Sequence, residues 1–174
     1  MTCNEVVYCK DRKEEFFADC VYKKDPDGRC QQESVSEYSP GPVKNEECLA
    51  RFVFYPTHMR ENVLDETLFS DIFKYGASCN RKSYCDEGQI HACGNGLQDE
   101  RRAYRGYVTL SVGFLRDVPG KNGVRVYDTA LEDNRFHTDI VAYPGMAKTE
   151  RKSIRMALLR HVLDNGGITP CCAG

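Results

Sequence analysis

The sequence predicts an α+β fold, in which a mostly antiparallel sheet is covered by a C-terminal helix and preceded by a small cysteine-rich metal-binding block. The first observation is the run 105–116, where Val108, Leu110, Val112 and Phe114 alternate with smaller or polar residues, as in a strand with one buried face. The second is a pair of further strand-like runs, 124–131 and 136–144. The third is the apolar stripe of a helix over 146–163, which Asn165 and two glycines end.

Residues 1–48, here called the N-terminal block, contain five cysteines. Four of them, Cys3, Cys9, Cys20 and Cys30, are separated by five, ten and nine residues, and Cys48 ends the block. A short helix is expected between Cys9 and Cys20, with an apolar end at Phe16–Ala18. The Pro and Gly of residues 25–29 indicate a tight turn before Cys30. A turn or a helix start can present thiolates, and four thiolates satisfy tetrahedral zinc. We therefore expect a zinc site here. An iron–sulfur cluster on the same thiols, two disulfides, or buried free cysteines remain open alternatives.

The order Tyr8-Cys9, Cys20-Val21-Tyr22 and Gly28-Arg29-Cys30 resembles a small cysteine knob of uncharacterised bacterial proteins. A second resemblance to such proteins rests on Asn134, His137, Asp139 and Ile140. These resemblances imply a bacterial origin, and they imply no activity.

Residues 31–47 are polar and contain Pro and Gly, so they indicate a linker. We therefore divide the chain into the N-terminal block and an α+β domain over 49–174. In that domain we expect a buried strand over 49–56, a helix over 57–76 that Gly76 ends, and a long loop over 77–104. The run 105–116 is expected to be the central strand. It should form an antiparallel hairpin with 124–131 through Gly120–Gly123.

The loop over 77–104 is a second candidate metal site, because it holds three cysteines and a histidine within fifteen residues: Cys79, Cys85, His91 and Cys93. Soft thiolates with an imidazole favour zinc. The alternative is a loop with incidental thiols.

A possible catalytic pair is His137 and Asp139, which lie on one face of the predicted strand 136–144. A carboxylate beside an imidazole can orient the ring and raise its basicity. In this hypothesis Arg81, Arg116 or Tyr127 would bind an anionic, nucleotide-like substrate. The structural alternative is a pair that meets polar side chains of a neighbouring strand.

Charge and composition narrow the function classes. The net charge of −2 provides no overall basic field for nucleic acid, and binding of nucleic acid through the N-terminal block and Arg101–Arg105 is a further alternative. No apolar run of membrane-spanning length and no leader are visible, which favours a cytoplasmic protein without a membrane partner. We expect a metal-stabilised interaction or adaptor module with a protein partner, a subunit of a larger bacterial assembly rather than an enzyme. A hydrolase or transferase using His137 and Asp139, and a secreted disulfide-stabilised protein, are the alternatives.

Overall fold

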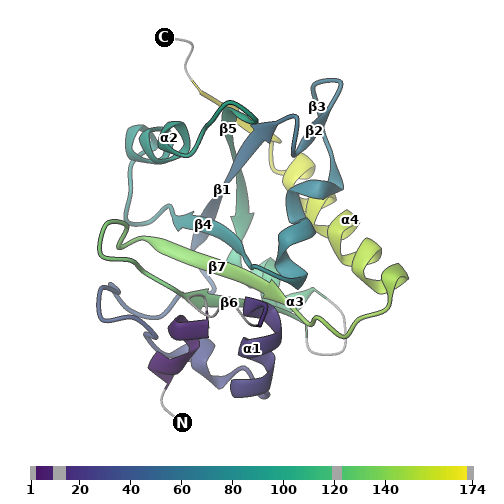
Figure 1. The fold of residues 1–174 in the computed structure, drawn as a ribbon. Helices are drawn as coiled ribbons and strands as arrows, with labels where there is room; N and C mark the ends of the chain where they lie inside the picture. The colour runs from purple at the N-terminus through teal and green to yellow at the C-terminus, as the bar shows by residue number, and fades with distance from the viewer. Residues whose placement is uncertain (1–2, 10–14, 119–122, 172–174) are drawn as a thin grey trace.

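The computed structural model describes residues 3–9, 15–118 and 123–171 of the 174-residue chain. Its main element is a six-stranded, fully antiparallel sheet with the strand order β6-β7-β4-β1-β5-β8 (Figure 1). This architecture confirms the predicted α+β class with its covering C-terminal helix. In the described ranges, none of the helices has both the length and the apolar character needed to cross a membrane.

The strands of the main sheet are β1 (Cys48–Tyr55), β4 (Ala77–Arg81), β5 (Ala103–Ser111), β6 (Val124–Asp128), β7 (His137–Ala142) and β8 (Ile168–Pro170). A separate hairpin joins β2 (Met59–Arg60) to β3 (Val63–Leu64). The α-helices are α1 (Phe17–Lys24), α2 (Glu87–Gly96), α3 (Val112–Asp117) and α4 (Lys148–Asp164). The described ranges also contain the 3-10 helices η1 (Cys3–Cys9), η2 (Arg29–Gln32) and η3 (Glu66–Phe73).

Alternation along the strands sends side chains to two faces of the sheet, and both faces are covered. On β6 and β7, Val126 and Ile140 enter a core with side chains of α3, α4 and η3. Their neighbours Tyr127 and Val141 instead pack against the N-terminal block. Nearly continuous burial along these strands follows from this double covering. The division of the chain at residue 48 stays a prediction.

The second face is shared by two covers. Near β1 and β5, helix α2 packs through Ile90 against aromatic residues that include Phe52 and Tyr104. Near β6 and β7, the N-terminal block lies against the sheet, at the bottom of Figure 1. Helix α2 has a capping box, in which Asp86 accepts from the Gln89 amide and Gln89 accepts from the Asp86 amide.

Several element predictions were wrong in detail. The run 105–116 divides, because Ser111 caps α3 by accepting from the Phe114 amide, and β5 lies beside β1 and β8 rather than at the centre. The predicted hairpin between 105–116 and 124–131 does not form, because β6 pairs with β7. Most of its expected turn, at 120–122, lies outside the described residues.

The predicted helix over 57–76 is instead the β2–β3 hairpin followed by η3. Glu61 and Asn62 adopt positive φ at the hairpin turn, which a helix would not allow. The predicted loop over 77–104 contains β4, α2 and the start of β5.

Gly106 shows why β5 needs a glycine within a strand. Its φ is 131°, and a Cβ there would lie 2.1 Å from the carbonyl oxygen of Thr169 in β8. The close approach of the two strands therefore excludes a side chain at this position.

Candidate functional site

Four of the five cysteines of the N-terminal block form two disulfides, Cys3–Cys30 and Cys9–Cys20. The Cα atoms of the pairs lie 5.3 Å and 5.7 Å apart, which suits a disulfide. Within the described ranges, no group of three or more His, Cys, Asp or Glu side chains could hold a metal ion. The predicted zinc or iron–sulfur site on these cysteines is therefore wrong, because their sulfurs are consumed in covalent bonds.

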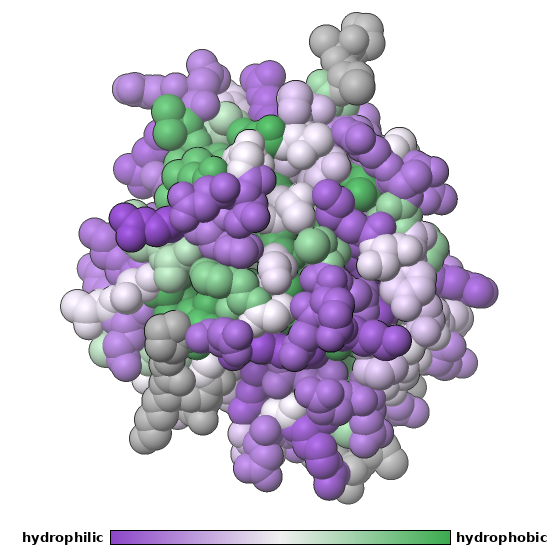
Figure 2. Space-filling model, turned by 180° about the vertical axis from the view of Figure 1, so that it is seen from behind, coloured by the Kyte–Doolittle hydropathy of each residue, from purple (hydrophilic) through white to green (hydrophobic). Residues whose placement is uncertain are grey.

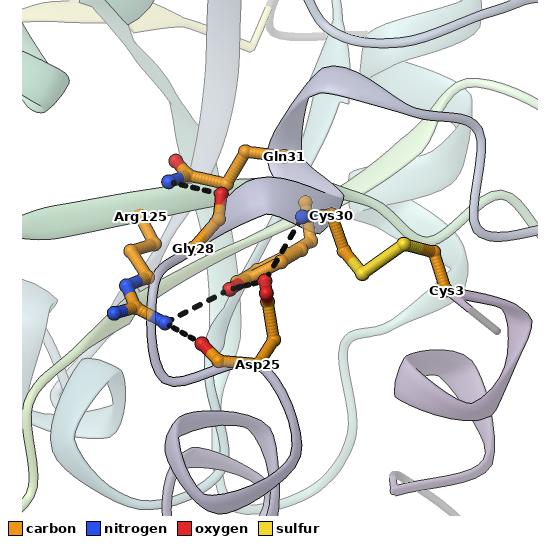
Figure 3. Close-up of a disulfide and its surroundings, with 7 residues drawn as sticks. Cys3, Asp25, Gly28, Cys30, Gln31 and Arg125 are labelled. Carbon is orange, nitrogen blue, oxygen red and sulfur yellow. Dashed lines mark hydrogen bonds between the residues drawn. A yellow bond between two sulfur atoms is a disulfide. The ribbon is translucent and has the colours of Figure 1, made fainter. Parts of the chain in front are cut away.

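Asp25, just after α1, is the polar centre that joins the N-terminal block to β6 (Figure 3). Its carboxylate accepts from the Cys30 amide at 3.1 Å and from the Tyr127 hydroxyl at 2.9 Å. Arg125 donates to the carbonyls of Asp25 and Pro26, and its guanidinium lies 3.9 Å from the centre of the Tyr22 ring. Burial raises the pKa of Tyr127, so its hydroxyl keeps its proton and acts as a donor.

Gln31 covers the free edge of the sheet. Strand β6 is an edge strand, yet all five of its residues are buried. The Val126 amide, which points away from β7, donates to the Gln31 side-chain oxygen at 2.9 Å. Gln31 also donates to the Gly28 carbonyl at 3.2 Å, which orients its amide group. The residue next to the Cys30 sulfur bridge thus supplies the hydrogen bond that a neighbouring strand would give.

The predicted catalytic pair lies on the face that the N-terminal block covers. Thr129 is positioned between the two groups: its hydroxyl lies 2.9 Å from His137 Nδ1 and donates to Asp139 at 2.6 Å. Ser78 of β4 donates to the other carboxylate oxygen at 3.2 Å. His137 and Asp139 are both buried, and His137 Nδ1 lies 3.8 Å from Asp139 Oδ2. The catalytic role stays a prediction. The geometry shows a polar cluster between neighbouring strands.

Arg81 lies on the opposite face and is completely buried. It donates to Glu47 from Nε and Nη2, at 2.8 Å and 2.6 Å, and to the carbonyls of Gly41 and Pro42. Burial alone would raise the pKa of Glu47, but the hydrogen bonds from Arg81 and from the Lys44 amide hold it below its usual range. Arg81 therefore fastens the segment before β1 to the sheet.

The other proposed substrate-binding residues also have structural partners. Arg116 donates to Asn45 and to the Val43 carbonyl, and Tyr127 donates to Asp25. Tyr127 shares a face with His137 and Asp139, whereas Arg81 does not. The structure therefore does not bring the predicted substrate-binding groups together around the pair. Their role stays a prediction.

The second predicted metal site is divided by the sheet. Cys79 enters the core under α4, while Cys85 and Cys93 lie in the cluster under α2. His91, on α2, contacts the Tyr104 hydroxyl through Nδ1 at 3.0 Å. Burial, with the neighbouring Cys93, raises the pKa of the Cys85 thiol to about 11, so it stays protonated. The zinc prediction for this set is wrong, because β4 turns Cys79 to the opposite face.

A groove of about 720 Å³ lies beside α4. Its lining combines Phe114 of α3 with Met156, Leu159 and Leu163 of α4. Met156 and Leu163 are about half exposed, and the Phe114 ring stacks on His161 at 3.8 Å. Figure 2 shows hydrophobic side chains gathered on the side of the molecule where α4 lies. Arg160 and Asp164 add one charge of each sign to the lining.

Sequence reasoning missed the residues that join the block to the sheet: Asp25, Gln31 and Arg125. One usable signal was Arg125 on the apolar strand 124–128, since an arginine between buried valines needs a specific partner. Gln31 gave no signal, because its role depends on which strand forms the edge. Comparisons of the chain with protein-family models, with curated proteins and with solved structures gave no match.

Proposed function

We propose that this chain is a disulfide-stabilised interaction protein that works in an oxidising compartment, outside the cytosol. The observation that carries the proposal is the pair of disulfides, which joins all four cysteines between residues 3 and 30. Disulfides persist in oxidising compartments and are rare in the cytosol. The proposal replaces the metal-stabilised, cytoplasmic adaptor that the sequence alone favoured.

The location of the disulfides supports a structural role for them. Cys9, Cys20 and Cys30 are almost completely buried, and they lie in elements of four to eight residues. Helices of that length are marginal in water without tertiary support. Cross-links that shorten the loops of the unfolded chain supply that support.

The groove beside α4 supports the interaction role. Clustered, partly exposed apolar side chains with a polar rim are typical of protein-binding surfaces. Lys152 and Arg160 lie one turn to either side of Met156, so the partner best suited to this stripe presents an apolar side chain flanked by carboxylates.

Counting thiols tests the compartment. The protein is secreted to the bacterial periplasm and denatured without reductant, and its thiols are titrated. Four of the ten cysteines should stay unreactive until a reductant is added. Peptide mapping should then find the pairs Cys3–Cys30 and Cys9–Cys20. Ten reactive thiols would overturn the proposal.

The groove needs a separate test. The variant Met156→Glu/Leu163→Glu should lose partners that chemical cross-linking captures with the wild-type protein. A matched variant, Val63→Glu, changes an exposed apolar residue on the β2–β3 hairpin instead. Equal capture by all three proteins would contradict a role for the groove.

A further inference from the structure

We propose that the edge of β6 is a strand-pairing surface for a second copy of this chain, and that the segment 25–32 masks it while the Cys3–Cys30 disulfide is intact. The inference rests on the proposed function, because it requires the oxidised pair. The partner is a second β6 edge, which would form an antiparallel pair across a two-fold axis.

The contacts that hold the mask converge on the segment 25–32. Gln31 accepts from the Val126 amide, and Arg125 holds the carbonyls of Asp25 and Pro26. Asp25 accepts from the amide of Cys30, whose sulfur is bonded to Cys3. Figure 3 shows Asp25, Cys30, Gln31 and Arg125 near the Cys3–Cys30 disulfide. Polar contacts and one covalent anchor therefore hold the mask, together with a bond from Arg116 to the Gln31 carbonyl and the packing of Cys30 in the cluster that contains Tyr127 and Val141.

The sheet does not depend on the disulfides for its own core. Both bridges lie within residues 3–30. The two clusters under α4 and under α2 draw their side chains from residues 43–171. Reduction should therefore loosen the N-terminal block and leave the strands paired. An uncovered edge five residues long, with an unsatisfied Val126 amide, is a template for another strand.

The sequence of β6 fits pairing with its own copy. In an antiparallel register that places Val126 opposite Val126, Arg125 of one copy lies opposite Tyr127 of the other. The same two side chains already contact within one chain, from Arg125 Nη1 to the Tyr127 hydroxyl at 3.3 Å. This register places no like charges opposite each other. Arg125 of each copy faces the aromatic ring of Tyr127 in the other copy.

The redox step needs an external dithiol. One of its thiolates attacks a sulfur of the Cys3–Cys30 bond and forms a mixed disulfide, and its second thiol then displaces the cysteine. Two electrons and two protons pass to Cys3 and Cys30, which become thiols, and the reductant becomes a disulfide. Cys3 is the less buried of the two cysteines, at 8% exposed against 2%.

Hydrogen exchange of the purified oxidised chain tests the mask. The Cys3→Ser/Cys30→Ser variant should exchange the Val126 amide at least about 100-fold faster than the wild type at micromolar concentration. Light scattering at higher concentration should show its mass doubling, with the Val126 amide protected again. The matched control, Cys9→Ser/Cys20→Ser, should keep the amide protected and the chain monomeric, because that bridge joins η1 to α1 and does not reach segment 25–32.

A second pair of variants keeps both disulfides. Gln31→Leu removes the acceptor and should expose the Val126 amide, whereas Gln31→Glu retains an oxygen and should protect it. The inference is overturned if Val126 stays protected in both Cys3→Ser/Cys30→Ser and Gln31→Leu. It is also overturned if the amide is exposed while the mass stays that of a monomer. Either result, with four cysteines still oxidised in the wild type, would leave the proposed function intact.

Discussion

The N-terminal block and the sheet use their cysteines in opposite ways. In the block, the four cysteines before residue 31 are cross-linked to one another. Cys48, at the start of β1, and Cys85, Cys93 and Cys171 keep free thiols. The sheet buries a large apolar core under α4, whereas the block has a smaller cluster that it shares with Tyr127 and Val141. The disulfides therefore lie in a region whose apolar cluster is smaller than the core under α4, and small secreted domains use disulfides in the same way.

The largest loss of stability is expected on substitution of Arg81, which fastens the segment before β1 to the sheet. Arg81→Met should lower the free energy of unfolding by about 3–5 kcal/mol, because Glu47 would stay buried without its cation. Denaturant unfolding measures the loss. The control is Arg60→Met, whose ion pair with Asp65 has an arginine side chain 78% exposed, and it should change little. A small loss at Arg81 would show that Glu47 is re-solvated.

Removing each disulfide separately shows how much each one stabilises the N-terminal block. The Cys3–Cys30 bond closes 27 residues of chain and the Cys9–Cys20 bond closes 11. The loop-entropy relation gives about 3.5 kcal/mol for the longer loop and about 2.8 kcal/mol for the shorter one. Cys3→Ser/Cys30→Ser should therefore be the less stable variant in denaturant unfolding. The reverse order would show that contacts in the folded state, rather than loop length, decide the loss.

Acid should destabilise the sheet region through His58. Burial, with the charges of Arg51 and Arg102, lowers the pKa of His58 to about 3, and its Nδ1 accepts from the Phe54 amide. In the unfolded chain, His58 takes up its proton near pH 6.5. The contribution of neutral, buried His58 to the free energy of unfolding is therefore complete above pH 6.5 and falls as the pH drops below that value. The loss at pH 5 should be about 2 kcal/mol. We expect the free energy of unfolding to lose this dependence on pH in His58→Asn, whose side chain keeps a hydrogen-bond acceptor. An unchanged slope would exclude His58 as its source.

The smallest effects compare two glycines of α2. A Cβ at Gly94 would lie 2.3 Å from the Tyr104 ring, whereas one at Gly96 meets nothing within 4 Å. Gly94→Ala should cost about 1–2 kcal/mol by overpacking. Gly96→Ala should gain up to about 1 kcal/mol from helix propensity. Thermal unfolding of both variants separates the contributions. Equal shifts in melting temperature would show that α2 moves away from the sheet at little cost.

Local patterns predicted the fold class well and the topology poorly. The strands at 49–56 and 136–144, and the helix at 146–163, were predicted within about two residues because each has a clear period. The pairing of β6 with β7 was missed, because the sequence does not specify which strands meet. The first metal site was wrong because spacing does not distinguish a thiolate ligand from half of a disulfide. The second was wrong because spacing does not show that the sheet separates Cys79 from Cys85 and Cys93. The contacts of Gln31 and Asp25 had no local pattern at all.

Pro170 has a consequence for the number of chains that can join. It lies at the end of the three-residue strand β8, opposite Gly106 on β5, and proline offers no amide hydrogen to a further strand. The two edges of the sheet therefore differ: β8 lacks an amide hydrogen at residue 170, whereas β6 is covered by the segment 25–32. A molecule with one usable end stops growing after a single symmetric union, whereas two usable ends would build a fibre. If β6 pairs as proposed, Pro170 therefore favours a dimer over a longer assembly.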